Sequence, residues 1–374
     1  MTDVSCRPWP VAALLAFALA GCSSVAHPAL DVPPDSTVPV DAPGDLVGET
    51  FGNIDAVPPA DLTSDFSPDA QAPRPFLVVT FNTGISMAPD GSPGSMTPAQ
   101  AEAADKLYGN GLAWLPAVDA ARIFLAAFDP DVVVFQEIFP SESCVDIPVE
   151  ARPGFVCETW QPGEPIVAQA VLGPGWQVAC NWLKHDKCAG VNRRFGTFRG
   201  CDGDLCLDGL AGSTIEGCGK GARVGRGVID LVGGGALNLV NVHGSSGIAA
   251  GDQDCRGKQF RQIFVDLGDG APAANGVRNL VLGDFNTDPA RLAEGDPSAA
   301  YLASQVGPGT RFHFLTDADP DGLPTYGGFV TIDHVIADFL DGTCWTAGVT
   351  EGAPAAPGPW FDHHPTACTV VPTQ

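Results

Sequence analysis

Three observations predict a layered α/β sandwich for the larger part of this 374-residue chain. Several short apolar runs are rich in Val, Leu and Ile, which indicates buried strands rather than helices. Stretches with helical spacing lie between these runs, and the sequence lacks the glycine fingerprint of a dinucleotide-binding fold. The apolar fraction of 45% is that of a protein with a sizeable core. A domain with two sheets and a site between them would suit this order.

The first elements alternate between strand and helix. A strand is expected at 76–82, and a helix is expected to begin at 97–98, where Thr supplies an N-cap and Pro occupies the first turn. A second helix is expected at 115–128, because apolar residues recur on overlapping faces and Asp-Pro follows at 129–130. A buried strand then leads to Glu137.

Residues 140–222 do not continue this pattern. The segment is rich in Gly and holds most of the cysteines, so we expect mainly loops there. A β-hairpin, a helix and three strands are expected beyond it. The hairpin strands are 228–232 and 237–242 around Gly233–Gly235, the helix is 256–268, and the strands lead to Asp284 and cover about 328–337 and 366–371.

The N-terminal residues predict export and a membrane anchor. Residues 1–21 contain a short apolar core, Val11–Ala20, typical of a secretory signal peptide. The sequence Leu-Ala-Gly-Cys that ends at Cys22 resembles a bacterial lipobox, which implies cleavage before Cys22 and lipidation of its thiol. A plain cleaved signal and an uncleaved anchor are the alternatives. We therefore expect an extracytoplasmic protein, either held at a bacterial membrane or secreted.

Residues 22–74 are expected to form a disordered tether. They are rich in Pro and Asp, with nine acidic residues and one arginine, and cannot bury enough apolar surface to fold. The folded domain is then expected at 75–374. Its ten remaining cysteines indicate disulfides in an exported protein, and Cys180 with Cys188 and Cys201 with Cys206 would close local loops, although sequence alone does not give the pairing. A zinc site is the weaker alternative, because no Cys-x-x-Cys pair occurs.

The formal net charge of −25 limits the possible partners. Coating a nucleic acid requires many Lys and Arg contacts to phosphate, and only 19 such residues occur against 44 acidic ones. About a third of the excess lies in the tether. The charge weakens a nuclease hypothesis without excluding it.

Polar residues follow several of the apolar runs. If the ends of these strands meet at one edge of a sheet, the polar side chains will lie close together there. Carboxylates, amides and imidazoles gathered there would suit a hard divalent cation and a phosphate ester. The residues in chain order are Asn82, Glu137, His243, Asp284, Asn286, Asp333, Asp362 and His363.

In this order the motifs resemble the endonuclease/exonuclease/phosphatase superfamily, which includes deoxyribonucleases, abasic-site endonucleases, inositol-polyphosphate phosphatases and bacterial sphingomyelinases. The resemblance implies a four-layer α/β sandwich and metal-dependent hydrolysis of a phosphoester. The matching pieces are Thr80-Phe81-Asn82, Gln136-Glu137, Asn241-Val242-His243, Gly283-Asp284-Phe285-Asn286, Ile332-Asp333-His334 and Phe361-Asp362-His363-His364-Pro365.

The resemblance, together with the chemistry of these side chains, predicts a metal site. Glu137 is the leading ligand for Mg²⁺ or Mn²⁺, with Asn82 and with Asp362 acting through water. Because Mg²⁺ keeps several waters, such a sparse set of protein ligands suffices.

The same reasoning assigns the catalytic roles. His363 is the expected base or electrostatic stabiliser, Asp333 fixes its tautomer, and Asp284 orients the attacking water. Asn286 is expected to donate to a phosphate oxygen. His243 matches an additional histidine of the deoxyribonuclease-like members and would protonate the leaving oxygen. His364 competes with His363, but the family pattern places the catalytic histidine directly after Asp.

Arg223 and Arg226 stand among glycines before a strand and are expected to bind phosphate, with His185 a weaker candidate. Together these expectations describe an extracytoplasmic, monomeric, Mg²⁺-dependent phosphodiester hydrolase, with endonuclease activity as one candidate. A sphingolipid or inositol phosphate phosphoesterase is the alternative enzyme. A non-catalytic surface binding protein of the same fold is the alternative outside enzymes.

Overall fold

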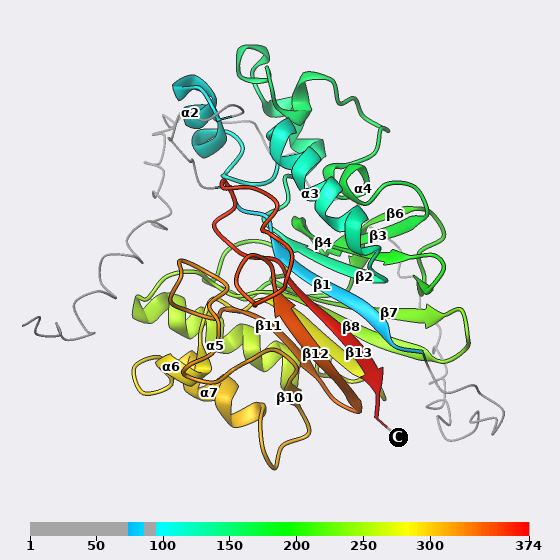
Figure 1. Ribbon diagram of the computed structural model, residues 1–374, viewed down its shortest axis with the longest axis vertical. Coiled ribbons are helices and arrows are strands. Elements are labelled where there is room, and N and C mark those ends of the chain that lie inside the picture. Colours follow the sequence, from blue (N-terminus) through cyan, green and yellow to red (C-terminus); the bar gives the residue numbers. More distant parts are fainter. Residues whose placement is uncertain (1–73, 86–94, 374) are drawn as a thin grey trace, which may run out of the picture.

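The computed structural model describes residues 74–85 and 95–373. They form two mixed β-sheets of seven and six strands, with helices on the outer side of each (Figure 1). This confirms the predicted four-layer α/β sandwich. The predicted signal peptide, Cys22 and nearly all of the predicted tether lie outside the described residues. Within these residues, no helix has the length and apolar character needed to cross a membrane.

The seven-stranded sheet contains β1, the first strand of the described chain, in its interior. Its order is β12-β13-β1-β2-β4-β3-β6. β1 runs parallel to β2 and antiparallel to β13. The strands are β1 (Phe76–Asn82), β2 (Val132–Gln136), β3 (Trp176–Asn181), β4 (Lys184–Asn192), β6 (Leu205–Leu210), β12 (Leu340–Thr346) and β13 (Thr366–Pro372).

The six-stranded sheet has the order β10-β11-β9-β8-β7-β5. β8 and β9 are parallel, and β11 runs antiparallel to β9. The strands are β5 (Gly196–Phe198), β7 (Val224–Leu231), β8 (Ala236–His243), β9 (Asn279–Asp284), β10 (His313–Phe314) and β11 (Asp333–Ala337). The expected hairpin is therefore β7 and β8.

Helices cover the outer face of each sheet. α2 (Pro98–Lys106), α3 (Leu115–Phe128) and α4 (Val167–Leu172) pack on the seven-stranded sheet. Thr97 caps α2 as the sequence predicts, with Pro in the first turn. α5 (Ala250–Phe264) and α7 (Pro297–Gln305) pack on the other sheet. The remaining short helices are α6 (Pro289–Leu292) and the 3₁₀ turns η3 (Ser141–Asp146), η4 (Val149–Ala151) and η5 (Val156–Glu158).

The layer between the sheets changes from apolar to polar toward one end. Alternate side chains of a strand face the same side, so β8 presents Leu237, Leu239, Asn241 and His243 toward the other sheet. The two leucines belong to the apolar core between the sheets, whereas Asn241 and His243 are buried polar groups. The neighbouring strands that end beside His243 also carry apolar side chains within the layer and polar side chains at that end. The polar side chains therefore gather at one edge of the two sheets.

The expectation of loops at 140–222 was wrong. This segment supplies β3, β4 and β6 of one sheet and β5 of the other. The strands of this segment were not predicted, because the sequence there lacks a clear strand pattern. β4, for example, begins with four charged or titratable residues, 184–187, instead of alternating apolar and polar positions. Smaller differences concern α5, which begins at Ala250 rather than 256, and β11, which begins at Asp333 rather than near 328.

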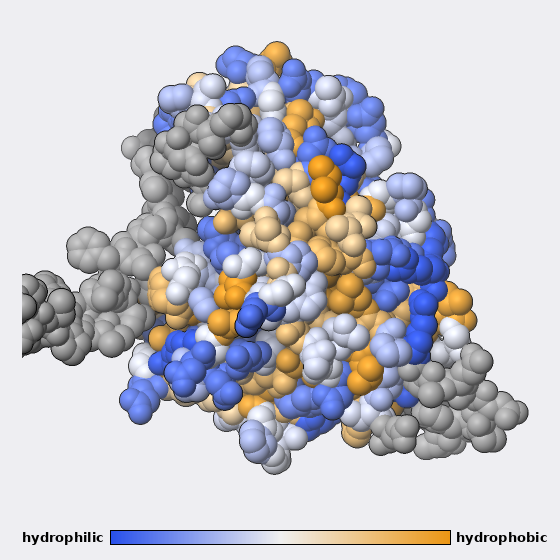
Figure 2. Space-filling view, viewed as in Figure 1, coloured by the Kyte–Doolittle hydropathy of each residue, from blue (hydrophilic) through white to orange (hydrophobic). Residues whose placement is uncertain are grey.

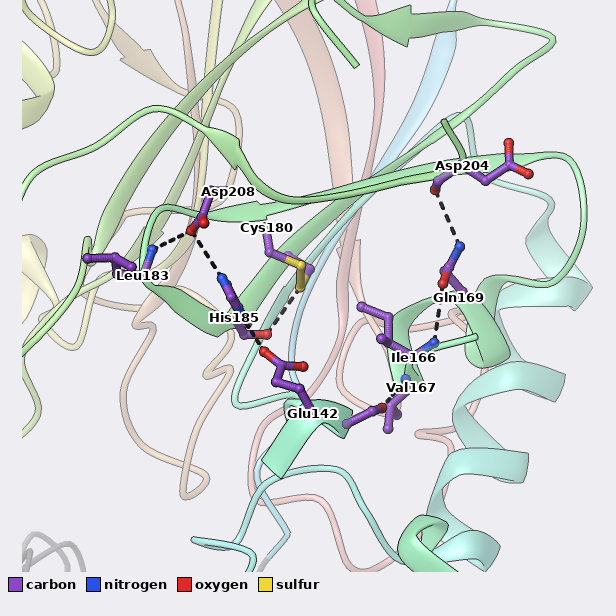
Figure 3. Close-up of a disulfide and its surroundings, with 11 residues drawn as sticks. Glu142, Ile166, Val167, Gln169, Cys180, Leu183, His185, Asp204 and Asp208 are labelled. Atoms are coloured by element: carbon purple, nitrogen blue, oxygen red, sulfur yellow. Dashed lines mark hydrogen bonds and ion pairs between the residues drawn. A yellow bond between two sulfur atoms is a disulfide. The ribbon is translucent and has the colours of Figure 1, made fainter. Parts of the chain in front are cut away.

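Five disulfides join the ten cysteines of the described domain, including both expected local pairs. The pairs are Cys144–Cys157, Cys180–Cys188, Cys201–Cys206, Cys218–Cys255 and Cys344–Cys368. Figure 3 shows Cys180 where its disulfide links β3 to β4. Beside it, His185 lies between the carboxylates of Glu142 and Asp208. On the face drawn in Figure 2, hydrophobic residues form a band down the middle between more polar margins.

Candidate functional site

One end of the two sheets gathers the predicted polar residues. β1 and β2 are parallel, and so are β8 and β9, so that the residues at their carboxyl ends reach the same edge. β11 runs the other way and begins there, with Asp333 opposite Asp284 in the pairing register. The site therefore draws on both sheets. The residues brought together are Asn82, Glu137, His243, Asp284, Asn286, Asp333, Asp362 and His363.

Asn82 connects the two halves of the site. Its Nδ2 lies 2.9 Å from Oδ2 of Asp284 on the six-stranded sheet and 3.4 Å from Oε1 of Glu137 on its own side. Its Oδ1 accepts a hydrogen bond from the backbone N–H of Gly84 at 3.0 Å. The amide donates to both carboxylates, which orients its oxygen away from them.

Three oxygen atoms surround the space above Gly84. A Cβ added to Gly84 would lie 2.5 Å from Oε2 of Glu137, 3.2 Å from Oδ1 of Asp362 and 3.3 Å from Oδ1 of Asn82. Only glycine leaves this space open. Oδ1 of Asp362 is buried and has no hydrogen-bond partner within the described part of the chain. We call this arrangement the oxygen cradle, defined by Asn82, Glu137 and Asp362.

The oxygen cradle suits a hard cation. Burial raises the pKa of Glu137, and the neighbouring charge of Asp362 raises it further. Burial also raises the pKa of Asp362. A cation among these oxygens would relieve both effects. No group of three or more His, Cys, Asp or Glu side chains in the described ranges forms a complete metal cage. Two carboxylates and one amide oxygen fit Mg²⁺ or Mn²⁺, because such ions retain several waters.

His363 is held by Asp333. Nδ1 of His363 lies 2.8 Å from Oδ2 of Asp333, and Nε2 lies 3.9 Å from Oδ2 of Asp284. Burial alone would lower the pKa of His363, but the negative charges of Asp333, Asp284 and Asp362 raise it well above its usual value. These charges therefore favour the imidazolium form of His363. His364, the competing candidate, uses Nδ1 to contact the backbone oxygen of Ala347.

Thr325 supports this pair from both sides. Its hydroxyl accepts the backbone N–H groups of Ile332 and Asp333 at 3.0 and 3.1 Å. Its carbonyl accepts the backbone N–H of His364 at 2.8 Å. The ring of Tyr326 packs against His363, with centroids 4.7 Å apart. Sequence reasoning missed Thr325, and the only available sign was a buried hydroxyl in a loop before a strand.

Asn286 orients Asp284. The backbone N–H of Asn286 donates to Oδ1 of Asp284 at 2.7 Å, and its side-chain Nδ2 donates to Oδ2 at 2.8 Å. Nδ2 also donates to the carbonyl of Gly244 at 3.1 Å, so both amide hydrogens are occupied. The predicted donation to phosphate therefore does not match this arrangement. Burial raises the pKa of Asp284 to about 7, an effect that the charge of His363 and the bonds from Asn286 and Asn82 oppose.

His243 is placed as a neutral imidazole. Its Nε2 lies 3.5 Å from Oε1 of Glu137 and 3.6 Å from Oδ2 of Asp284. Its buried Nδ1 has no hydrogen-bond partner among the described residues. Burial lowers the pKa of His243 well below its usual value, and the charges of Lys187 and Arg223 add to this. The lowered pKa disfavours the protonated form that the expected role as an acid requires.

The structure separates the two predicted arginines. Nη1 of Arg223 donates to the carbonyls of His243 and Gly244 at 3.4 and 3.2 Å, which places its guanidinium beside the site. Arg226 instead pairs with Asp269 and the carbonyl of Pro272 on the helix-covered side of β7. Its predicted role in binding phosphate is not supported, because strand alternation turns it away from the mouth. His185, occupied by two carboxylates, is not directed at the site either.

Comparisons with known proteins give similarity of fold only. Neither a protein-family model nor a curated protein matches this chain. Among solved structures, an endonuclease/exonuclease/phosphatase from Beutenbergia cavernae has 18% identity and a TM-score of 0.45, covering 80% of this chain and 72% of its own. A humanized D. rerio TDP2 has 12% identity and a TM-score of 0.44, covering 79% and 98%. The Xenopus laevis APE2 catalytic domain has 14% identity and a TM-score of 0.43, covering 79% and 93%. Identities and TM-scores this low do not assign an activity to the chain.

Proposed function

We propose that the folded domain is a hydrolase that uses Mg²⁺ or Mn²⁺ to cleave a phosphodiester bond. One observation carries the proposal: the oxygen cradle and the Asp333–His363 pair both adjoin the same buried carboxylate, Asp284. Asn82 contacts Asp284 at 2.9 Å, and His363 approaches it at 3.9 Å. A site that holds a cation, a fixed carboxylate and an imidazolium together suits the cleavage of an anionic ester.

Each group then has a role. A cation in the cradle of Asn82, Glu137 and Asp362 would supply positive charge to the phosphate and the departing oxygen. Asp284, fixed by Asn286, would hold the attacking water in line with the phosphorus and accept its proton as the P–O bond forms, while the departing oxygen leaves and takes a proton from solvent. The imidazolium of His363 would stabilise charge on a non-bridging oxygen. Asp333 maintains the orientation and charge of His363.

His243 and Arg223 extend the phosphate site on the side of the six-stranded sheet. A neutral His243 with hydrogen on Nε2 would donate to a phosphate oxygen without exchanging a proton. The charge of Arg223 adds attraction for an anion at the same edge, because its guanidinium reaches the carbonyl of His243.

The substrate that we favour is a phosphodiester short enough to avoid long contact with an acidic protein surface. Endonuclease activity remains one candidate, and sphingolipid or inositol phosphate esters are the alternative. Incubating the purified protein and Mg²⁺ with plasmid DNA, sphingomyelin vesicles and inositol phosphates, each with an EDTA control, tests the proposal. EDTA-sensitive product from plasmid DNA or sphingomyelin supports it, whereas phosphate released only from inositol phosphates, which are monoesters, would indicate a phosphatase instead. Binding of Mg²⁺ without any product would favour the non-catalytic binding protein.

We also propose that the mature protein is a monomeric, extracytoplasmic lipoprotein attached through Cys22. Five disulfides support an oxidising compartment. The lipobox-like sequence before Cys22 supports a lipid anchor. Mass spectrometry of the N-terminal peptide tests it: an acylated Cys22 is expected. An unmodified peptide or intact residues 1–21 would contradict the anchor.

A further inference from the structure

A buried hydrogen bond joins the two sheets directly beneath the site. Nε2 of Gln136 on β2 donates to Oδ1 of Asn241 on β8 at 2.9 Å. Both side chains are fully buried. β2 belongs to the seven-stranded sheet and β8 to the six-stranded sheet, so this bond crosses the layer between them.

Both partners lie next to site residues in the chain. Gln136 directly precedes Glu137 of the oxygen cradle. Asn241 precedes His243 by two residues on the same face of β8, and His243 pairs in register with Asp284. A shift of one sheet relative to the other would therefore move the cradle relative to Asp284 and His243. Other bonds also link the two sides at this end, among them those from Asn82 to Asp284, from Asn181 to the carbonyl of Ala222 and between His363 and Asp333.

Stability does not explain the amide pair. The apolar cluster between the sheets consists of aliphatic and aromatic side chains with a few cysteines, and Thr80 and Gln177 are further buried polar residues on the same faces of their strands. Oε1 of Gln136 receives only a long contact of 3.4 Å from Thr80 Oγ1, and Nδ2 of Asn241 has no partner in the described ranges. Replacing two bonded polar groups by apolar groups of similar shape is often close to neutral for stability. What the amide pair adds is direction, because a hydrogen bond has a preferred length and angle.

We propose that the Gln136–Asn241 hydrogen bond is a positioning element for catalysis. It fixes the spacing between the cradle residues Asn82 and Glu137 on one sheet and Asp284 and His243 on the other. The inference rests on the proposed phosphodiester hydrolysis and deepens it. Neither amide touches the substrate, so their effect passes through the residues beside them.

The experiment compares three variants of the full chain. The first, Gln136→Leu with Asn241→Leu, replaces the bond by an apolar contact. The second, Gln136→Asn with Asn241→Gln, exchanges the two amides and keeps a bond of the same total length. The third, Thr80→Val, alters the same polar layer within one sheet. For each, the melting temperature, the Mn²⁺ affinity and the kcat and KM for bis(p-nitrophenyl) phosphate are measured.

The leucine pair is expected to melt near the wild-type temperature but to lose about 100-fold in kcat, since small misplacements of reacting groups have effects of that order. Its KM should change little, and Mn²⁺ should bind more weakly. The exchanged pair should recover most of the lost kcat, and Thr80→Val should resemble wild type. Recovery by the exchanged pair is the result that a merely structural role would not produce.

Wild-type kcat and Mn²⁺ affinity in a folded leucine pair would overturn the positioning role while leaving the proposed function intact. So would a leucine pair that fails to fold, because the bond would then be needed for stability. An exchanged pair as impaired as the leucine pair would also overturn it. Wild-type protein that neither binds Mn²⁺ nor hydrolyses any diester would remove the proposed function, and the positioning role with it.

Discussion

Nδ1 of His363 and Oδ2 of Asp333 lie 2.8 Å apart, although the two residues come from different strands and loops. This bond leaves Nε2 of His363 facing the space beside Asp284. Asp333 is fully buried and its second oxygen, Oδ1, has no partner in the described part of the chain. The imidazole of His363 is therefore almost the only partner of the Asp333 carboxylate, so replacing Asp333 tests this pair.

Asp333→Asn is expected to reduce kcat by about 100-fold or more, because an amide neither stabilises the imidazolium nor fixes its tautomer as a carboxylate does. KM should change much less than kcat. Steady-state kinetics on the diester substrate check this. Asp341→Asn, an exposed change on β12, is the matched control and should leave kcat unaltered. Equal kcat in both variants would show that the function of His363 does not require the carboxylate of Asp333.

Glu137→Gln is expected to abolish metal dependence without unfolding the domain. Glu137 keeps a side chain that is 35% exposed, so its amide analogue can be accommodated without burying a new polar group. Mg²⁺ should raise the melting temperature of the wild type and not that of the variant, because binding to the folded state stabilises it. Glu150→Gln, an exposed change on η4, should behave as wild type. A thermal shift that survives in Glu137→Gln would place the cation elsewhere.

Thr325→Val should lower kcat, whereas Thr325→Ser should retain most of it. Valine keeps the shape but leaves the backbone N–H groups of Ile332 and Asp333 without their acceptor. Serine preserves that acceptor. An unmatched buried donor costs about 1–3 kcal/mol, so urea unfolding should show Thr325→Val to be the less stable of the two. Indistinguishable valine and serine variants would show that this hydroxyl is dispensable.

Lys187 gives a prediction about alkaline stability. Its side chain is 1% exposed and its ammonium contacts Asp186 at 2.8 Å. Burial lowers the pKa of Lys187 to about 8, against the opposing effect of Asp186, whereas the unfolded value is 10.5. Between these values the unfolded chain binds more protons than the folded one, so this group makes stability rise with pH from about 8 toward 10.

Urea unfolding at pH 8, 9 and 9.5 measures this dependence on pH. Lys187→Met is expected to flatten the rise, since methionine fills a similar space without titrating. Lys258→Met removes a half-exposed lysine on α5 and should keep the wild-type slope. Parallel slopes in all three proteins would mean that Lys187 is not held in the way the structure indicates.

The sequence predicted β1, β2, β8 and β9, which end in the site, because each is an apolar run followed by a polar residue, whereas Asp333 begins β11 and His363 precedes β13. For Asn82, Glu137, Asp284, Asp333 and His363 the structure brings the predicted side chains to one place. The hydrogen bond between the buried amides behind them was not predicted, since Gln136 and Asn241 enter the sequence motifs only as neighbours of Glu137 and His243. Their position one or two residues before a site residue was the available signal.

Two other features could not be predicted from the sequence, because they depend on how strands pair in the folded protein. β4 contains a buried lysine, Lys187, in its charged first half. This composition is typical of a loop, although β4 is an interior strand of its sheet. Arg226 lies among glycines and resembles a phosphate-binding loop residue, but the register of β7 turns it toward Asp269. In both cases strand pairing with distant residues, rather than local composition, decides where the charge lies.

Gly84 offers a way to tell an active chain from an inactive one with the same fold. Its backbone φ lies outside the left-handed region, so alanine would be conformationally acceptable, yet the added methyl would stand within 2.5 Å of Glu137 Oε2. One carbon atom would thus exclude the ion while the sheets stay as they are. A homologue with any larger residue at this position would be expected to retain the architecture and have no hydrolytic activity.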